Sequence, residues 1–123
     1  KKIGSISINR NKITKDNLGF IEKIKNSVKN SNRPIIIFPQ ATRVLPYEKV
    51  PFKKGVGRIY SELGIKCQPL AINSGHVWPK DGKLTSNKSI TISILKPISS
   101  ELNSIEFINT IEKKIYSELN FIS

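Results

Sequence analysis

The stretch IIIFPQATR, residues 35–43, decides the predicted fold because it joins a fully apolar run to a polar cluster. Four apolar residues lead into Pro39, and the cluster over 40–43 follows directly. A short run that is apolar at every position is typical of a strand buried on both faces of a parallel sheet. In such sheets, ligands bind beyond the carboxyl ends of the strands. We therefore expect a buried strand over 35–38 and a ligand site at its end.

Periodic patterns on both sides of this stretch predict alternating strands and helices. Apolar stripes at helical spacing predict helices, which lie over residues 18–28, 52–63 and 107–119. Asp16 is the expected N-terminal cap of the first helix, and Gly64 is the expected C-terminal cap of the second. Alternating or apolar runs predict further strands, at residues 3–9, 67–73 and 89–95. The expected fold is α/β, with a single-layer, mixed and largely parallel sheet flanked by helices.

Two glycines lie inside the second expected helix. Gly55 and Gly57 each lower helix propensity by about 1 kcal/mol relative to alanine. A helix that keeps both glycines is expected to have its backbone closely packed at these two positions.

The length of 123 residues fits one compact domain over 1–123. The longest apolar run, over 35–38, is too short to cross a bilayer. A single cysteine, Cys67, excludes an internal disulfide and is interpreted as a packed strand residue. Because the chain starts at Lys1 and contains no methionine, we expect it to be the C-terminal portion of a longer, N-terminally truncated domain.

The formal net charge of +12 favours anionic partners. Nucleic acid, acidic lipid head groups and acidic carrier proteins all meet this requirement. A lysine-rich composition that keeps a small protein soluble explains the same charge without any partner. The charge alone therefore leaves these interpretations open.

The polar cluster after the apolar run suits an anionic ligand. Arg43 carries a planar fork of donors that matches a phosphate, and Thr42 and Gln40 add neutral donors. A solvated arginine in a turn at the end of a strand explains the same residues without a ligand. Physical chemistry alone does not separate the two interpretations.

Several motifs in one order also carry a family resemblance. FPQATR over 38–43 is similar to a Phe-Pro-Glu-Gly-Thr-Arg signature, and FKKG over 52–55 to a Phe-Lys-x-Gly motif. QPL over 68–70 and the glycine-to-arginine segment GSISINR over 4–10 complete the set. On these residues the chain resembles the glycerophospholipid acyltransferase family, and within it the 1-acylglycerol-3-phosphate acyltransferases.

The resemblance implies a fold like that of glycerol-3-phosphate acyltransferase and a transfer of an acyl group. A fatty acyl thioester, on coenzyme A or on acyl carrier protein, would acylate lysophosphatidic acid to give phosphatidic acid, with no cofactor or metal. Arg10 and Arg43 would hold the substrate phosphate, while Gln40, Ala41 and Thr42 would shape the glycerol pocket. An anionic membrane surface is a further expected partner.

Two positions depart from the signature of the family. Gln40 stands where the signature has glutamate, which keeps hydrogen bonding and removes a negative charge. Ala41 stands where the signature has glycine, and its Cβ disfavours a positive φ.

The catalytic pair of the family is a histidine with an aspartate after four intervening residues, placed before the glycine–arginine motif. Here that position precedes Lys1, so we assign no catalytic residue and expect the chain alone to be inactive. His76 and Asp81 have the spacing. They follow the signature, however, and Pro79 interrupts a helix between them, so we interpret His76 as a surface-loop residue.

Two other functions fit the sequence. One is a basic nucleic-acid-binding module. The sequence has no zinc-ligand spacing and no interleaving of aromatic and basic residues, so we expect no nucleic acid partner. The other is a non-catalytic membrane-surface protein of the same fold. The expected location is the cytoplasmic face of a membrane, peripheral or anchored through a part that precedes Lys1.

Overall fold

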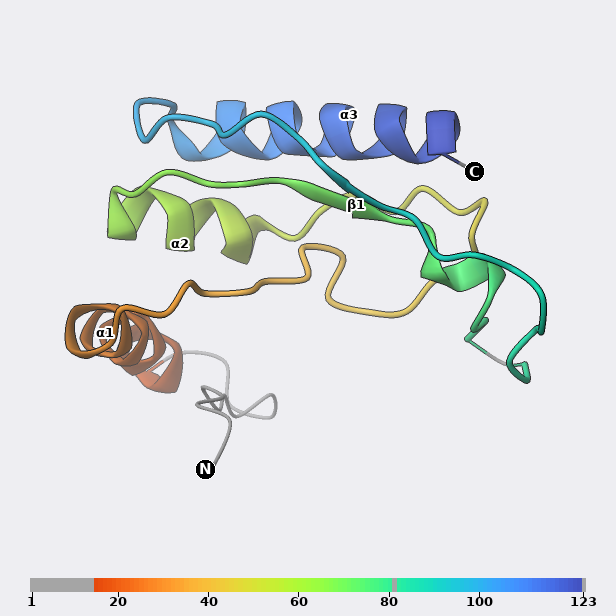
Figure 1. Ribbon diagram of the computed structural model, residues 1–123. Coiled ribbons are helices and arrows are strands. Elements are labelled where there is room, and N and C mark those ends of the chain that lie inside the picture. Colours follow the sequence, from red (N-terminus) through yellow and green to blue (C-terminus); the bar gives the residue numbers. More distant parts are fainter. Residues whose placement is uncertain (1–14, 81, 123) are drawn as a thin grey trace. The chain divides into compact units, whose positions relative to one another are not determined.

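The computed structural model describes residues 15–80 and 82–122 of a small α/β protein (Figure 1). It divides the chain into two compact units, Lys1–Ile37 and Phe38–Ser123. The first unit contains helix α1, Lys15–Asn30, and the second contains all other described elements. The expected α/β class is therefore confirmed, while the expected strand over 3–9 lies outside the described residues.

Helix α1 carries the predicted amphipathic pattern. Ile21 and Ile24 are buried, and Val28 on the same stripe is half-buried. The helix begins at Lys15, so Asp16 lies inside its first turn and the prediction that it caps the helix is wrong.

The second unit contains two long helices, a two-stranded sheet and one 3-10 turn. These elements are α2 (Lys54–Leu63), β1 (Leu70–Ile72), η1 (Ser74–His76), β2 (Ile92–Ile94) and α3 (Ser104–Ile122). The strands pair antiparallel, with Leu70 opposite Ile94 and Ile72 opposite Ile92. Helix α3 packs against both α2 and β1 (Figure 1).

The ends of both helices are fixed by local sequence. Gly64 takes the left-handed conformation at φ 61°, and its N–H donates to the carbonyl of Tyr60, which confirms the expected cap of α2. At the start of α3, the Asn103 side chain accepts from the backbone N–H of Glu106 at 2.9 Å, and its amide donates to the Glu106 carboxylate. Asn103 thus caps the helix through its side-chain oxygen, as in a capping box, whereas Glu106 returns the bond to the side-chain amide of Asn103.

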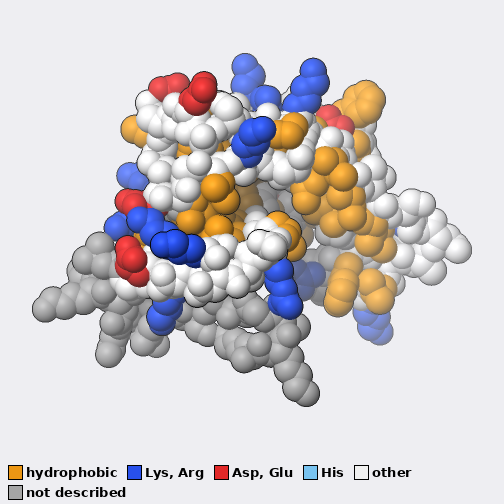
Figure 2. All heavy atoms as spheres, turned by 60° about the vertical axis from the view of Figure 1, so that its left-hand side comes forward, with side chains coloured by type: hydrophobic (Ala, Val, Ile, Leu, Met, Phe, Trp, Pro, Cys, Tyr) orange, Lys and Arg blue, Asp and Glu red, His pale blue; other side chains and the backbone are white. Residues whose placement is uncertain are grey.

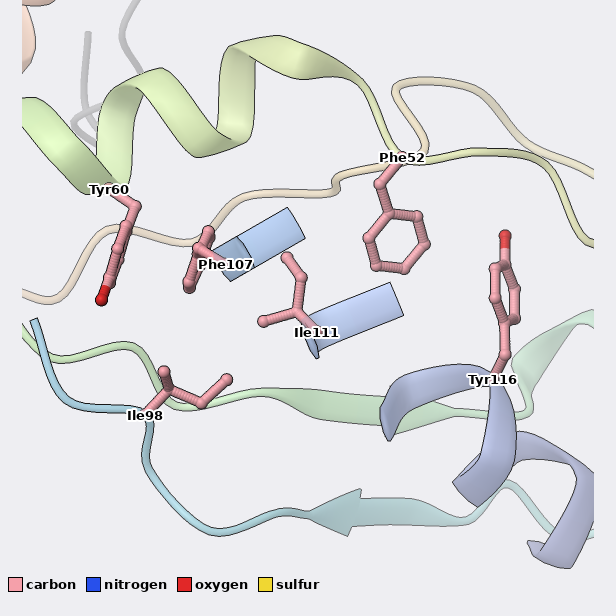
Figure 3. Close-up of a cluster of buried hydrophobic side chains, with 6 residues drawn as sticks. All are labelled: Phe52, Tyr60, Ile98, Phe107, Ile111 and Tyr116. Carbon is pink, nitrogen blue, oxygen red and sulfur yellow. The ribbon is translucent and has the colours of Figure 1, made fainter. Parts of the chain in front are cut away.

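The core of the second unit lies between α2, α3 and the segment around Ile98, which follows β2 (Figure 3). Its buried members are Phe52, Tyr60, Ile98, Phe107, Ile111 and Tyr116. The rings of Tyr60 and Phe107 stack with their centroids 3.7 Å apart. Phe107 is only 1% exposed, and Ile108, Ile115 and Leu119 pack around the cluster, so the predicted stripe of the closing helix is confirmed.

The predicted buried strand over 35–38 is wrong. These residues form no strand, and Ile36 and Phe38 are 77% and 78% exposed. A run that is apolar throughout indicates burial, but a strand also needs neighbouring strands that bond its backbone N–H and C=O groups. The described residues form one antiparallel pair of strands, so the larger and largely parallel sheet stays a prediction.

Candidate functional site

The signature begins with a tight turn. The N–H of Ala41 donates to the carbonyl of Phe38 at 3.0 Å, and Ala41 has φ 60°. The left-handed conformation costs a residue with a Cβ about 1–2 kcal/mol, which glycine avoids. The replacement of the signature glycine by Ala41 therefore has a structural consequence, because alanine adopts here a conformation that it disfavours.

The loop after the turn folds back on itself. The N–H of Lys53, at the start of α2, donates to the carbonyl of Pro39 at 2.9 Å and closes the loop over 39–53. A smaller turn inside the loop is closed by the N–H of Glu48, which donates to the carbonyl of Leu45 at 3.0 Å.

Helix α3 fastens this loop with two side chains that lie one helical turn apart. The Glu112 carboxylate accepts from the backbone N–H of Phe52 at 2.9 Å. The Tyr116 hydroxyl donates to the carbonyl of Val50 at 2.6 Å and accepts from the side-chain amide of Gln40 at 3.0 Å. A signature residue is therefore held by a helix that begins 64 positions later in the chain.

Arg43 is held from the other side of the site by the segment around Trp78. Its Nη2 donates to the carbonyls of Trp78 and Pro79, at 3.3 and 3.4 Å. Its Cζ lies 5.8 Å from the centroid of the Trp78 ring, which is within the range of a cation–π contact. Nε and Nη1 donate no hydrogen bond within the described part of the chain.

The other site residues are placed as follows. Gln40 is half-buried, whereas Ala41, Thr42 and Arg43 are exposed. Thr42 Oγ1 makes one long hydrogen bond, 3.5 Å, to the carbonyl of Arg43. Arg10 lies outside the described residues, so its expected convergence with Arg43 stays a prediction.

His76 ends the 3-10 turn and is exposed. It lines an open groove of about 250 Å³ together with Lys49 and Tyr116. The segment over 76–80 is not α-helical, and Asp81 lies outside the described residues. His76 and Tyr116 thus line one groove, and within the described residues no carboxylate is paired with His76.

Three residues of the site could not be found by motif. In the sequence, Glu112 and Tyr116 lie inside the helix predicted over 107–119, and Trp78 is an isolated aromatic residue near Pro79. Their partners lie 35 to 76 positions away along the chain. The only sequence signal was the one-turn spacing of Glu112 and Tyr116 on α3, which names no partner.

The described residues show no cluster of histidine, cysteine or acidic side chains that could hold a metal ion. Burial raises the pKa of the Cys67 thiol, which packs beside the core. On the face shown in Figure 2, lysine and arginine side chains are exposed with hydrophobic side chains between them. In the part of the chain that is described, no helix has the length and apolar character that a membrane span requires.

Comparisons with known proteins support the resemblance. A family model described as Acyltransferase matches residues 1–73. A 1-acyl-sn-glycerol-3-phosphate acyltransferase of Cocos nucifera is 28% identical over 98 residues, which cover 79% of this chain and 32% of that protein. The chain thus spans about a third of the length of this relative. No solved structure matches the chain significantly. The segment that the family model matches contains all five predicted site residues, whereas Trp78 and Tyr116 lie beyond it.

Proposed function

Because the chain belongs to the acyltransferase family, we propose that it takes part in the acylation of lysophosphatidic acid to phosphatidic acid. This is a step of phospholipid biosynthesis. The described residues would form the part of the site that binds the phosphate and the glycerol. The relative from Cocos nucifera, by its name, acts on 1-acyl-sn-glycerol 3-phosphate, and this supports the choice of acceptor.

The proposed reaction needs no covalent enzyme intermediate. The free hydroxyl oxygen of the acceptor attacks the carbonyl carbon of the acyl thioester. An ester C–O bond forms, the C–S bond breaks, and the hydroxyl proton passes through a general base to the released thiol. The donor would be acyl-coenzyme A or an acyl carrier protein, and the reaction uses no cofactor.

The arrangement of Arg43 is the observation that carries the proposal. Its guanidinium contacts two backbone carbonyls and the Trp78 ring, and the residue as a whole is exposed. An arginine fixed in this way loses little conformational entropy when it binds a phosphate. Arg43 also lies in the segment that the family model matches, residues 1–73, and ends the signature-like stretch FPQATR. Arg10 is the proposed second phosphate ligand.

We place the reaction at the cytoplasmic face of a membrane that carries anionic lipids. The net charge of +12 supports this because acidic head groups, coenzyme A and acyl carrier protein all attract a basic surface. Exposed apolar side chains such as Trp78 suit the interface.

The proposal assigns no base to the described residues. His76 is exposed and follows the signature, so we expect His76→Ala in a longer protein that carries an upstream His-x-x-x-x-Asp to change acylation little. A positioned base accelerates proton transfer by about 10²–10⁴-fold, so the 123-residue chain alone should show at most a trace rate. Efficient acylation by this chain, abolished by His76→Ala, would show that His76 is the base.

Calorimetric binding to the 123-residue chain tests the proposal directly. Lysophosphatidic acid should bind, and a monoacylglycerol without phosphate should bind much more weakly. Arg43→Ala should weaken the binding of lysophosphatidic acid at least about tenfold, because a hydrogen bond to a charged group contributes about 1.5–3 kcal/mol. The matched control is Arg58→Ala, which removes an exposed arginine from α2.

Two results would contradict the proposal. One is equal affinity for the phosphorylated and unphosphorylated lipids. The other is tight binding of a short oligonucleotide that does not depend on Arg43, which would favour the nucleic-acid-binding alternative.

A further inference from the structure

The Tyr116 hydroxyl joins three parts of the second unit. It receives a hydrogen bond from Gln40 Nε2 at 3.0 Å and gives one to the carbonyl of Val50 at 2.6 Å. The Tyr116 ring is buried and lies against Phe52, with the centroids 5.3 Å apart. In Figure 3 the Tyr116 oxygen is directed away from the helix backbone of α3.

The number of protons in this network determines which side chain fits at position 40. A phenol carries one proton, and at Tyr116 this proton goes to Val50. The lone pairs of the same oxygen can then only accept, so the partner at position 40 has to donate. The amide of Gln40 donates, whereas a glutamate carboxylate has no hydrogen to give. A carboxylate here would either face the phenol lone pairs or take the proton and leave the Val50 carbonyl without a donor.

From this geometry we propose that Tyr116 is a positioning residue, which holds Gln40 for the bound glycerol and makes position 40 require an amide. With Nε2 bonded to Tyr116, the Gln40 side chain is anchored and its Oε1 accepts no hydrogen bond within the described residues. A hydroxyl of the acceptor glycerol is a donor of the kind that Oε1 can receive. Arg43, three positions further, is then left to the phosphate.

The requirement for an amide rests on the geometry alone, while the glycerol contact rests on the proposed function. The two parts therefore need different measurements. The first is a double-mutant cycle of Gln40→Glu and Tyr116→Phe, followed by urea unfolding at pH 7, where glutamate is ionised. Phenylalanine keeps the packing against Phe52 and removes only the hydroxyl.

In the presence of Tyr116, Gln40→Glu should raise the unfolding equilibrium constant about tenfold, as expected for one half-buried group left without a partner. In the Tyr116→Phe protein the same change should raise the unfolding equilibrium constant by less than about threefold, because the phenol that opposes a carboxylate is absent. An equal effect of Gln40→Glu in both proteins would overturn the amide requirement.

The second measurement compares two soluble probes, sn-glycerol 3-phosphate and inorganic phosphate, by calorimetry. Tyr116→Phe should weaken the binding of glycerol 3-phosphate by about 3–10-fold. It should change the affinity for inorganic phosphate by less than about twofold, because only the first probe carries the hydroxyl groups. The matched control is Tyr60→Phe. This second buried tyrosine of the same core donates to the carbonyl of Ser99 and accepts from the N–H of Leu102 at 3.1 Å. Tyr60→Phe should lower stability and keep the ratio of the two affinities.

Each outcome of the binding measurement has a distinct meaning. If the unmodified chain binds both probes and Tyr116→Phe keeps their ratio, the positioning role is overturned and the proposed function stands. If the unmodified chain binds neither probe, the proposed function is contradicted together with the glycerol contact. The unfolding cycle still supports or overturns the amide requirement in that case.

Discussion

The guanidinium of Arg43 lies over the indole of Trp78, with Cζ 5.8 Å from the ring centroid. The backbone carbonyl of the same tryptophan accepts a hydrogen bond from Arg43 Nη2 at 3.3 Å. Trp78 therefore supports Arg43 with both its ring and its backbone. The two contacts can be separated by mutation, because a substitution at position 78 removes the ring and keeps the carbonyl.

The first prediction concerns this aromatic support. Trp78→Ala should weaken the binding of both inorganic phosphate and glycerol 3-phosphate by about 2–5-fold, because an exposed cation–π contact contributes about 0.5–1 kcal/mol. Trp78→Phe keeps an aromatic face and should weaken the binding of both ligands less than Trp78→Ala does. Calorimetric titration measures both effects. Tyr47→Ala, which removes an exposed aromatic residue of the signature loop, is the control and should have no effect. A loss confined to glycerol 3-phosphate would show that Trp78 contacts the glycerol instead of supporting Arg43.

The second prediction concerns the strained turn at Ala41. Ala41→Gly should raise the free energy of unfolding by about 0.5–1 kcal/mol, because the relief at φ 60° exceeds the entropy that a glycine adds to the unfolded chain. Differential scanning calorimetry should show the corresponding rise in Tm. Gly64→Ala makes the opposite change at φ 61°, with no atom near the new Cβ, and should lower the stability by about 1 kcal/mol. A fall in Tm for Ala41→Gly would contradict the strain.

The helices could be predicted from the sequence because their signals are local. The stripe over 107–119, the cap at Gly64 and the stripe of α1 all depend on residues within a few positions of one another. The structure confirms these three features, and the observed helix ends lie at most three residues from the predicted ones.

The strands and the support of the site depend on contacts that no local pattern names. The apolar run over 35–38 was assigned a buried strand because hydrophobicity indicates burial, but strand pairing needs a partner at a definite register. In the same way, Gln40 is identified by its place in the signature, while its partner Tyr116 lies inside the helix predicted over 107–119 and has no role assigned from the sequence. The bond between them joins residues 76 positions apart. The signature residues can therefore be proposed as a site from the sequence, whereas the residues that contact Gln40 and Arg43 cannot.

The third prediction concerns the single cysteine. Burial raises the pKa of the Cys67 thiol, so the native protein contains less thiolate at neutral pH than the unfolded chain does. The native thiol should react with a chromogenic disulfide reagent more slowly than the thiol in urea-unfolded protein at pH 7–8. Because the folded state keeps this proton to a higher pH, the free energy of unfolding should fall as the pH rises through the range of the thiol. Equal rates in both states would contradict the burial of Cys67.

The final prediction tests the contact between α2 and α3 through the two glycines of α2. A Cβ at Gly57 would lie 2.5 Å from Ser104 Oγ and 2.7 Å from Ile108 Cδ1, whereas a Cβ at Gly55 would meet no atom within 4 Å. The expected close packing thus holds at Gly57 and does not hold at Gly55. Gly57→Ala should lower the free energy of unfolding by about 1–3 kcal/mol, because the Ser104 and Ile108 side chains have to shift to accommodate the methyl group.

Gly55→Ala is the matched control in the same helix. It should raise the free energy of unfolding by about 0.5–1 kcal/mol through helix propensity alone. Urea unfolding of the two variants measures both changes, and their opposite signs separate packing from propensity. The double variant Gly57→Ala with Ile108→Val should regain part of the loss, since valine removes the Cδ1 atom that the new methyl group meets. Stabilisation by both single variants would show that α2 and α3 are not in contact at Gly57.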